Sequence, residues 1–310
     1  MPDKAGYSGQ KWLKLHNIAN WEWNLLDTLL SLVLGLWTKS LTFIHFCIRF
    51  YVLILSGVFS ALCLHKEVQK NLSLVYSANV SLKQTQTYIR KILTYVLEVL
   101  TIKHLPDSLL RRIIPDAGLA PLNQALSRGR GLILLVMHAG NWELFGCALG
   151  RFGYRVAAVV NNPRNDKLIA YIDKNRVKSG LEIIDINTQN MYRACLQAFA
   201  ANKIVMIAVD TGATDSDKNI ILPVLGREVP VATGWATLAL RARPLILPVF
   251  NYSEKGRHGY ICGEIIQPEQ FPDEKTLLEP ILNFYTAQLR LRPLEWFLPI
   301  STSETRKTFG

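Results

Sequence analysis

Leu132-Ile-Leu-Leu-Val-Met137 is an uncharged apolar run that continues directly into His138-Ala-Gly-Asn-Trp-Glu143. Such a run predicts a strand buried on both faces, as in a parallel sheet covered by helices. Gly140 and Asn141 then predict a turn, and the apolar sequence that follows can continue as a helix. This order of elements places His138 at the carboxyl end of a strand, where open α/β sheets bind their ligands.

Strands and helices alternate along the chain from residue 132 onward. Strands are expected at 132–137, 155–160, 182–186, 204–209, 244–250 and 259–266, and helices at 142–149, 166–178, 189–201, 233–241 and 274–290. The alternation predicts an α/β fold with a mostly parallel sheet flanked by helices on both faces. Residues 65–130 are expected to be helical, with a 3.6-residue period from Lys83 to Lys103.

The composition is both apolar and basic. Of the 310 residues, 49% are hydrophobic and 19% are charged, and the formal net charge is +11. These values favour an anionic membrane surface over nucleic acid as a partner, because no basic run with interleaved aromatic residues is present. The five cysteines and six histidines show no metal-ligand spacing, so we expect no metal site, no disulfide framework and a reducing compartment.

The N-terminal part is the most apolar region of the chain. From Leu25 to Leu64 charged residues are few, and Phe50–Leu64 has none. We therefore expect a membrane-associated segment over residues 1–64 and a separate domain over residues 65–310. The uncharged stretch is shorter than the roughly 20 residues that span a bilayer, so spanning and interfacial binding both remain open. The alternative is a buried pair of helices.

His138 and Glu143 form the candidate catalytic pair. An imidazole and a carboxylate five residues later can act as a general base and the group that orients it. The alternative is a histidine that only makes structural hydrogen bonds at a strand end. The motif G-x-S-x-G is absent, which argues against a nucleophilic serine on a sharp strand–helix turn.

Three further residues at the same edge are candidate substrate contacts. Gly140 permits close approach of the backbone, and Asn141 lies beside it at the start of the predicted helix, where amide groups can stabilise an oxyanion. Asp210 follows the strand predicted at 204–209 and so points to the same edge as His138. Asp210 is expected either to position a substrate hydroxyl or to cap a loop.

Several motifs occur in the order in which they occur in a known family. His138-x4-Glu143 is followed by Asn161-Asn-Pro-Arg-Asn165, by Val209-Asp-Thr-Gly212 and by Val231-Ala-Thr-Gly-Trp-Ala-Thr-Leu-Ala239. This series resembles the bacterial lipid A biosynthesis acyltransferases, within the broader glycerolipid acyltransferase superfamily. The likeness extends over roughly residues 60–298.

The resemblance implies a membrane-bound acyltransferase. It would move a fatty acyl chain from an acyl carrier protein or coenzyme A thioester to a hydroxyl of a lipid or glycolipid acceptor, with no cofactor besides this co-substrate. The acceptor would attack directly, with His138 as general base and Glu143 as its partner. The enzyme would lie at the inner membrane with its catalytic domain facing the cytoplasm. Two alternatives are a catalytically silent lipid-binding protein on the same fold and a lipid hydrolase.

Arg164 and Arg176 are candidate ligands for a phosphate group, because a planar guanidinium binds such oxygens in a forked geometry. The family commonly has Tyr-Arg-Pro after its second strand, whereas here Arg164 follows the proline of Asn161-Asn-Pro163. The role of Arg164 is therefore carried over with an offset. For both arginines the alternative is a solvated surface charge. The Arg-rich tail of the family is also absent after Glu295-Trp-Phe297.

Overall fold

The structure is a computed structural model that describes residues 50–51, 54, 64–115, 118–161, 167–210, 219–254, 257–300 and 308. Most of the apolar segment between Leu25 and Leu64, and Arg164 as well, lie outside these ranges. No helix within the described ranges is long and apolar enough to cross a membrane. The membrane-associated segment therefore stays a prediction.

A six-stranded sheet with the order β3-β2-β4-β1-β7-β8 forms the centre of the fold. Only β8 is antiparallel to its neighbour, and the other neighbouring strands are parallel. The strands are β1 Leu132–Val136, β2 Val156–Val160, β3 Leu181–Asp185, β4 Ile204–Ala208, β7 Leu245–Glu254 and β8 Arg257–Cys262. This arrangement confirms the predicted α/β fold with a mostly parallel sheet.

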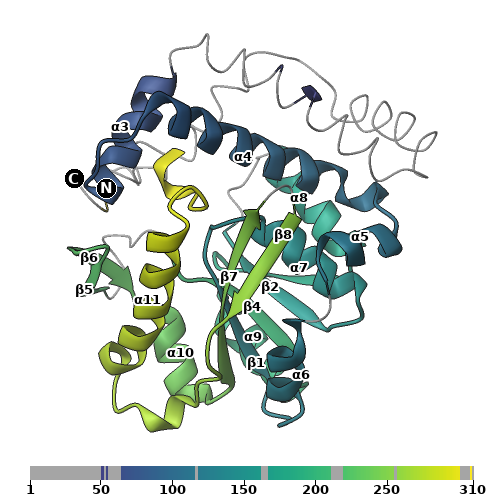
Figure 1. Ribbon diagram of the computed structural model, residues 1–310. Helices are drawn as coiled ribbons and strands as arrows, with labels where there is room; N and C mark the ends of the chain where they lie inside the picture. The colour runs from purple at the N-terminus through teal and green to yellow at the C-terminus, as the bar shows by residue number, and fades with distance from the viewer. Residues whose placement is uncertain are drawn as a thin grey trace, which may run out of the picture.

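Helices cover both faces of this sheet (Figure 1). They are α5 Asp107–Ile113, α6 Ala120–Leu126, α7 Trp142–Arg151, α8 Lys167–Lys178, α9 Met191–Ala200, α10 Gly234–Ala242 and α11 Glu274–Leu291. Ile133 and Leu135 of β1 pack with α9, α10 and α11. Leu132 and Leu134 pack on the other face with α5, α6 and α7. Because β1 is buried on both faces, its sequence is apolar at every position rather than at alternate ones.

Two N-terminal helices, α3 Leu64–Tyr76 and α4 Leu82–Thr101, pack against each other. Ser81 and Gln84 form a capping box at the start of α4, which satisfies amide groups that have no partner within the helix. α4 lies across one end of the sheet (Figure 1). The turn after β1 contacts α4, because Asn141 donates a hydrogen bond to the carbonyl of Tyr95. α4 therefore covers the end of the sheet at which the parallel strands finish.

One element was not expected from the sequence. β5 Asn219–Val224 and β6 Arg227–Ala232 form an antiparallel hairpin outside the main sheet. Its turn residues Leu225 and Gly226 both have positive φ, at 53° and 85°, as the twist of a tight hairpin requires. The sequence does not predict this turn, because its first position is leucine, whereas glycine or asparagine usually occupies a position with positive φ.

Candidate active site

β1 and β4 bring His138 and Asp210 to the same point at the edge of the sheet. The two strands are parallel neighbours, and Val136 is paired with Ala208. His138 and Asp210 each follow that pair by two positions, so they leave the sheet side by side. Nδ1 of His138 lies 2.8 Å from Oδ1 of Asp210. The backbone amide of His138 also donates to both carboxylate oxygens, at 3.0 and 3.1 Å.

This pairing determines which nitrogen of His138 is available for chemistry. The indole Nε1 of Trp296 donates to Oδ2 of Asp210 at 2.6 Å, so both oxygens of the carboxylate accept hydrogen bonds. An ionised carboxylate can only accept, so Nδ1 carries the proton and Nε2 keeps its lone pair. The His138 side chain is 33% exposed, against 7% for Asp210. Nε2 can therefore accept a proton from a bound molecule.

The surrounding charges strengthen His138 as a base. Burial favours the neutral imidazole, but the negative charge of Asp210 and its hydrogen bond outweigh burial and raise the pKa of His138. The charge of Glu143 acts in the same direction and that of Arg176 opposes it. Burial also favours neutral Asp210, yet the charge and hydrogen bonds of His138 and the indole of Trp296 lower the pKa of this carboxyl group. Asp210 is thus ionised when it faces the imidazole.

Glu143 does not make the contact with His138 that the sequence suggested. Its carboxylate accepts hydrogen bonds from Nε and Nη2 of Arg176, with 3.0 Å between Nε and Oε2. Arg176 donates in addition to Asp173 at 2.7 Å. The reason is geometric, because Glu143 lies in the first turn of α7 and faces α8, whereas Asp210 comes from the strand beside His138. The carboxylate that contacts the His138 ring is therefore that of Asp210.

Arg176 lies inside this ion-pair network. Its side chain is 12% exposed, as is that of Glu143, and it contacts two carboxylates. This arrangement favours an internal ion pair over recognition of a substrate phosphate. Arg164, the other arginine expected to bind phosphate, lies outside the described residues.

Gly140 and Asn141 both make contacts that shape the turn. Gly140 has φ +58°, and a Cβ placed on it would lie 2.4 Å from the backbone of Asn251. Its amide donates to the carbonyl of Glu295 at 3.0 Å and is not available for an oxyanion. The Asn141 side chain accepts from the Leu144 amide at 3.0 Å and so caps α7. It also donates to Glu98, at 2.8 Å.

A sequence profile described as Bacterial lipid A biosynthesis acyltransferase matches residues 20–281. The chain belongs to this family. The match covers most of the chain and includes both strands that carry His138 and Asp210. Membership makes the protein a lipid acyltransferase, with an acyl donor and a lipid acceptor as substrates. A comparison with curated proteins found no match.

The acyltransferase has a second buried polar cluster beside the turn, which sequence reasoning missed. Nε2 of His258 lies 3.0 Å from Glu98, and Glu98 in turn accepts from Asn141. Burial alone would lower the pKa of His258, but the charge of Glu98 and its hydrogen bond raise it. A lone histidine on the last strand gives no sequence signal for a carboxylate on α4, about 160 residues earlier in the chain.

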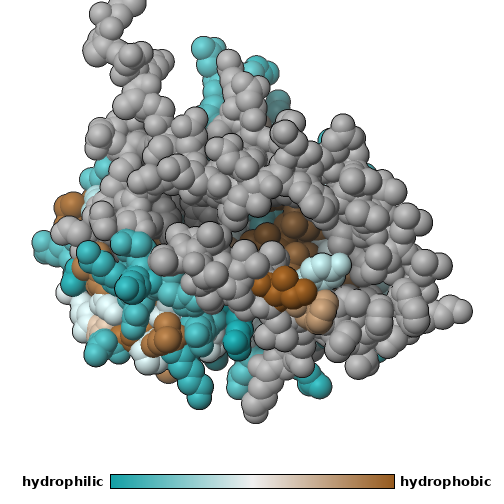
Figure 2. Space-filling view, turned by 90° about the horizontal axis from the view of Figure 1, so that it is seen from above, coloured by the Kyte–Doolittle hydropathy of each residue, from teal (hydrophilic) through white to brown (hydrophobic). Residues whose placement is uncertain are grey.

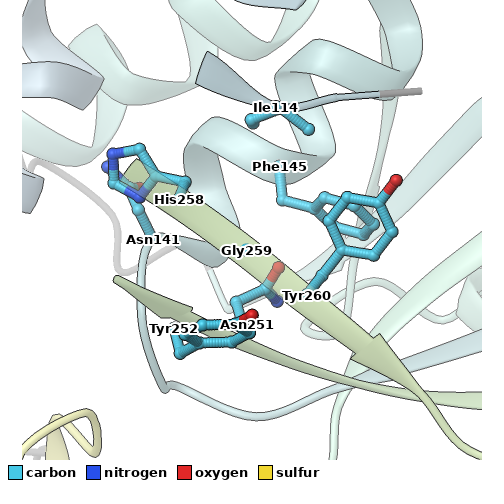
Figure 3. A pocket seen from close by; sticks show the side chains of 8 residues that line it. All are labelled: Ile114, Asn141, Phe145, Asn251, Tyr252, His258, Gly259 and Tyr260. Atoms are coloured by element: carbon cyan, nitrogen blue, oxygen red, sulfur yellow. The ribbon is translucent and has the colours of Figure 1, made fainter. Parts of the chain in front are cut away.

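A small pocket lies next to this cluster (Figure 3). The side chains of His258 and Asn141 lie at one side of it and the rings of Phe145 and Tyr260 at the other (Figure 3). The side-chain nitrogen Nδ2 of buried Asn251, which also lines the pocket, has no hydrogen-bond partner among the described residues. In the part of the chain that the structure describes, no group of three His, Cys, Asp or Glu side chains is placed to hold a metal ion.

The face of the acyltransferase seen from above, on the side of α4, is of mixed character. One group of hydrophobic side chains and, apart from it, one group of mostly hydrophilic side chains are visible in this view (Figure 2).

Proposed function

We propose that this acyltransferase moves a fatty acyl chain from an acyl carrier protein or coenzyme A thioester to a hydroxyl group of a lipid A-like acceptor, with His138 as the general base. The observation that carries the proposal is the His138–Asp210 pair, in which Asp210 occupies Nδ1 while the partly exposed ring leaves Nε2 to receive a proton. The family match supports the class of reaction.

The reaction needs no acyl-enzyme intermediate. Nε2 of His138 takes the proton of the acceptor hydroxyl while the hydroxyl oxygen forms a bond to the thioester carbonyl carbon. The tetrahedral intermediate then collapses, the carbon–sulfur bond breaks, and the departing thiolate takes the proton from the imidazolium. Asp210 stabilises the imidazolium between these two steps, as the buried carboxylate of a catalytic triad does.

The oxyanion of the intermediate needs hydrogen-bond donors. The amides of Trp142 and Glu143, in the first turn of α7, have no acceptor among the described residues. Their position after His138 supports them as donors to the developing negative charge. Arg164 remains our candidate ligand for a phosphate of the donor or acceptor, on the resemblance of its motif alone.

The mechanism is tested with the full chain, labelled acyl thioester and a lipid A precursor. His138→Ala should reduce transfer by about 10²- to 10⁴-fold, the usual cost of losing a general base. His104→Ala, a histidine outside the site, is the matched control and should retain full activity. Retention of wild-type transfer by His138→Ala would overturn the assignment. Free fatty acid as the only product would instead indicate a hydrolase, and no product from wild-type protein would indicate a silent lipid-binding protein.

Location is the second part of the proposal. The apolar region between Leu25 and Leu64 and the net charge of +11 support attachment to the anionic inner membrane, with the catalytic domain in the cytoplasm where both thioesters occur. When cells are lysed at low salt without detergent, the full chain should sediment with the membranes. Recovery of all the protein in the supernatant would contradict this part without affecting the mechanism.

A further inference from the structure

Three consecutive residues near the C-terminus, Glu295, Trp296 and Phe297, cross the catalytic turn. The carbonyl of Glu295 accepts from the amide of Gly140 at 3.0 Å, and the amide of Phe297 donates to the carbonyl of His138 at 2.7 Å. Trp296 forms an isolated β-bridge with Ala139 between these two contacts. Segment 295–297 therefore runs beside the turn and pairs with it through this single bridge and its two flanking hydrogen bonds.

Both ends of this segment are anchored. The carboxylate of Glu295 is 3% exposed, forms an ion pair with Lys91 and accepts from the Tyr95 hydroxyl at 2.6 Å. The ring of Phe297 packs edge-on against Trp142, with 4.6 Å between the ring centroids. Trp142 in turn packs edge-on against His138 at 4.8 Å. These contacts restrict the position of Trp296 relative to the catalytic pair.

Within this segment, the side chain of Trp296 forms a hydrogen bond to the catalytic pair. Its Nε1 lies 2.6 Å from Oδ2 of Asp210, on the carboxylate oxygen that His138 Nδ1 does not contact. Trp296 is 3% exposed, so water does not compete readily for this oxygen. A carboxylate held at both oxygens cannot rotate away from the imidazole without losing a buried hydrogen bond.

We propose that Trp296 is a positioning residue for acyl transfer, which acts through Asp210 by holding its carboxylate in the orientation that receives Nδ1–H of His138. The inference rests on the proposed function of the His138–Asp210 pair. Trp296 does not contact the reacting atoms. Its contribution is a side-chain donor to Oδ2, at 2.6 Å, beside the backbone amide of His138, which lies 3.1 Å from the same oxygen.

The protein contains a matched tryptophan that lacks such a contact. Trp235 is also buried, at 8% exposure, and its Nε1 has no hydrogen-bond partner among the described residues. Trp296→Phe and Trp235→Phe therefore remove the same indole N–H and much the same volume from two buried sites. Only the first change removes a hydrogen bond to the catalytic pair.

The first measurement is steady-state kinetics on the full chain with labelled acyl thioester and lipid acceptor. Trp296→Phe should lower kcat by about 10- to 100-fold with KM changed less than about threefold, since orientation of the base affects the chemical step. Trp235→Phe should stay within about twofold of the wild type. Equal losses in both variants would show that only packing matters and would overturn the proposal.

A double-mutant cycle tests whether Trp296 acts through Asp210. In the Asp210→Asn background, Trp296→Phe should change kcat less than about threefold, because the carboxylate it would position is gone. A loss as large as in the wild-type background would overturn the proposal. Wild-type activity in Asp210→Asn alone would contradict the proposed function instead, so the two failures are distinguishable.

The pH dependence of kcat/KM is a third measurement, and a simple loss of packing would not change it. The charged and titratable groups that face the pair are Glu143 on α7, Arg176 on α8 and Tyr285 on α11. Without the Trp296 donor the Asp210 anion is less stabilised and holds the proton of the His138 imidazolium more strongly. The pKa of His138 should therefore rise, and the acid limb of kcat/KM should move to higher pH. An unchanged acid limb would count against the proposal.

If Trp296→Phe does not fold, replacing Trp296 with β-(3-benzothienyl)alanine removes the N–H while keeping the bicyclic ring, and the same outcomes apply.

Discussion

At the scale of single residues, reactivity depends on which carboxylate faces the imidazole. Asp210 and Glu143 are both close enough to His138 to raise its pKa, but only Asp210 hydrogen-bonds to its ring. Both carboxylate oxygens of Glu143 accept hydrogen bonds from Arg176 instead. A carboxylate on Nδ1 selects the tautomer, whereas a nearby carboxylate contributes only its charge. We therefore expect the two acids to have different roles in the proposed mechanism.

Replacing each acid by its amide separates these tasks. Asp210→Asn should lower kcat/KM by about 10²- to 10⁴-fold and move its acid limb to lower pH, because burial lowers the pKa of His138 once the negative charge is gone. Glu143→Gln keeps Asp210 on Nδ1, so its acid limb should move less. The measurement is kcat/KM from pH 5 to 9, and a larger shift in Glu143→Gln would contradict the assignment.

At the scale of elements, the turn between β1 and α7 determines where His138 and the first amides of the helix lie. Asn141 caps the helix, and Gly140 approaches the backbone of Asn251 on β7 more closely than any residue with a Cβ could. Segment 295–297 contacts the same turn through two backbone hydrogen bonds. The turn is thus held by backbone contacts from two distant parts of the chain.

Gly140→Ala should disturb this turn severely. The new Cβ would meet the Asn251 backbone at 2.4 Å, and φ +58° is itself unfavourable for alanine. Together these effects should lower the free energy of unfolding by about 3 kcal/mol and reduce transfer sharply. Gly129→Ala is the matched control, since Gly129 also has positive φ, at +68°, but no contact within 4 Å of the added Cβ among the described residues. Equal losses in unfolding by denaturant would show that the close approach is unimportant.

At the scale of the whole molecule, two polar pairs join α4 to other parts of the fold, one to the sheet and one to segment 295–297. His258 on β8 pairs with Glu98, and Glu295 pairs with Lys91. The side chains of His258 and Glu98 are 8% and 9% exposed, so their interaction is little screened by water. α4 therefore keeps its place over the carboxyl ends of the strands through charges as well as through its apolar face.

This coupling makes the stability of the fold depend on pH. Burial opposes protonation of His258, but Glu98 raises its pKa overall, so the folded state binds the proton more tightly than the unfolded state. The stabilisation is complete below about pH 6.5 and is lost as pH rises through the raised pKa. The melting temperature should fall between pH 6 and 9. In His258→Gln this fall should be smaller, by about 2–4 °C for each kcal/mol that the His258–Glu98 pair contributes to the free energy of unfolding. An identical slope in the variant would exclude the pair as its source.

The sequence by itself determined the layers of the fold and the place of His138 at a strand end. The uncharged run 132–137 predicted a central strand, and the alternation after it predicted the parallel sheet and most of its helices. His138 was expected at a strand end, and Asp210 at the same edge. These features follow from local hydrophobic patterning and turn residues, which act over a few neighbouring positions.

Only the tertiary structure decided which groups meet at that edge. That β4 lies next to β1, in a register that sets Asp210 beside His138, depends on hydrogen bonds between strands about 70 residues apart. The hydrogen bond from Trp296 to Asp210 likewise joins residues that are 86 positions apart in the chain. No local pattern encodes strand order or such returns, because every buried parallel strand has nearly the same apolar sequence and can pair with any other.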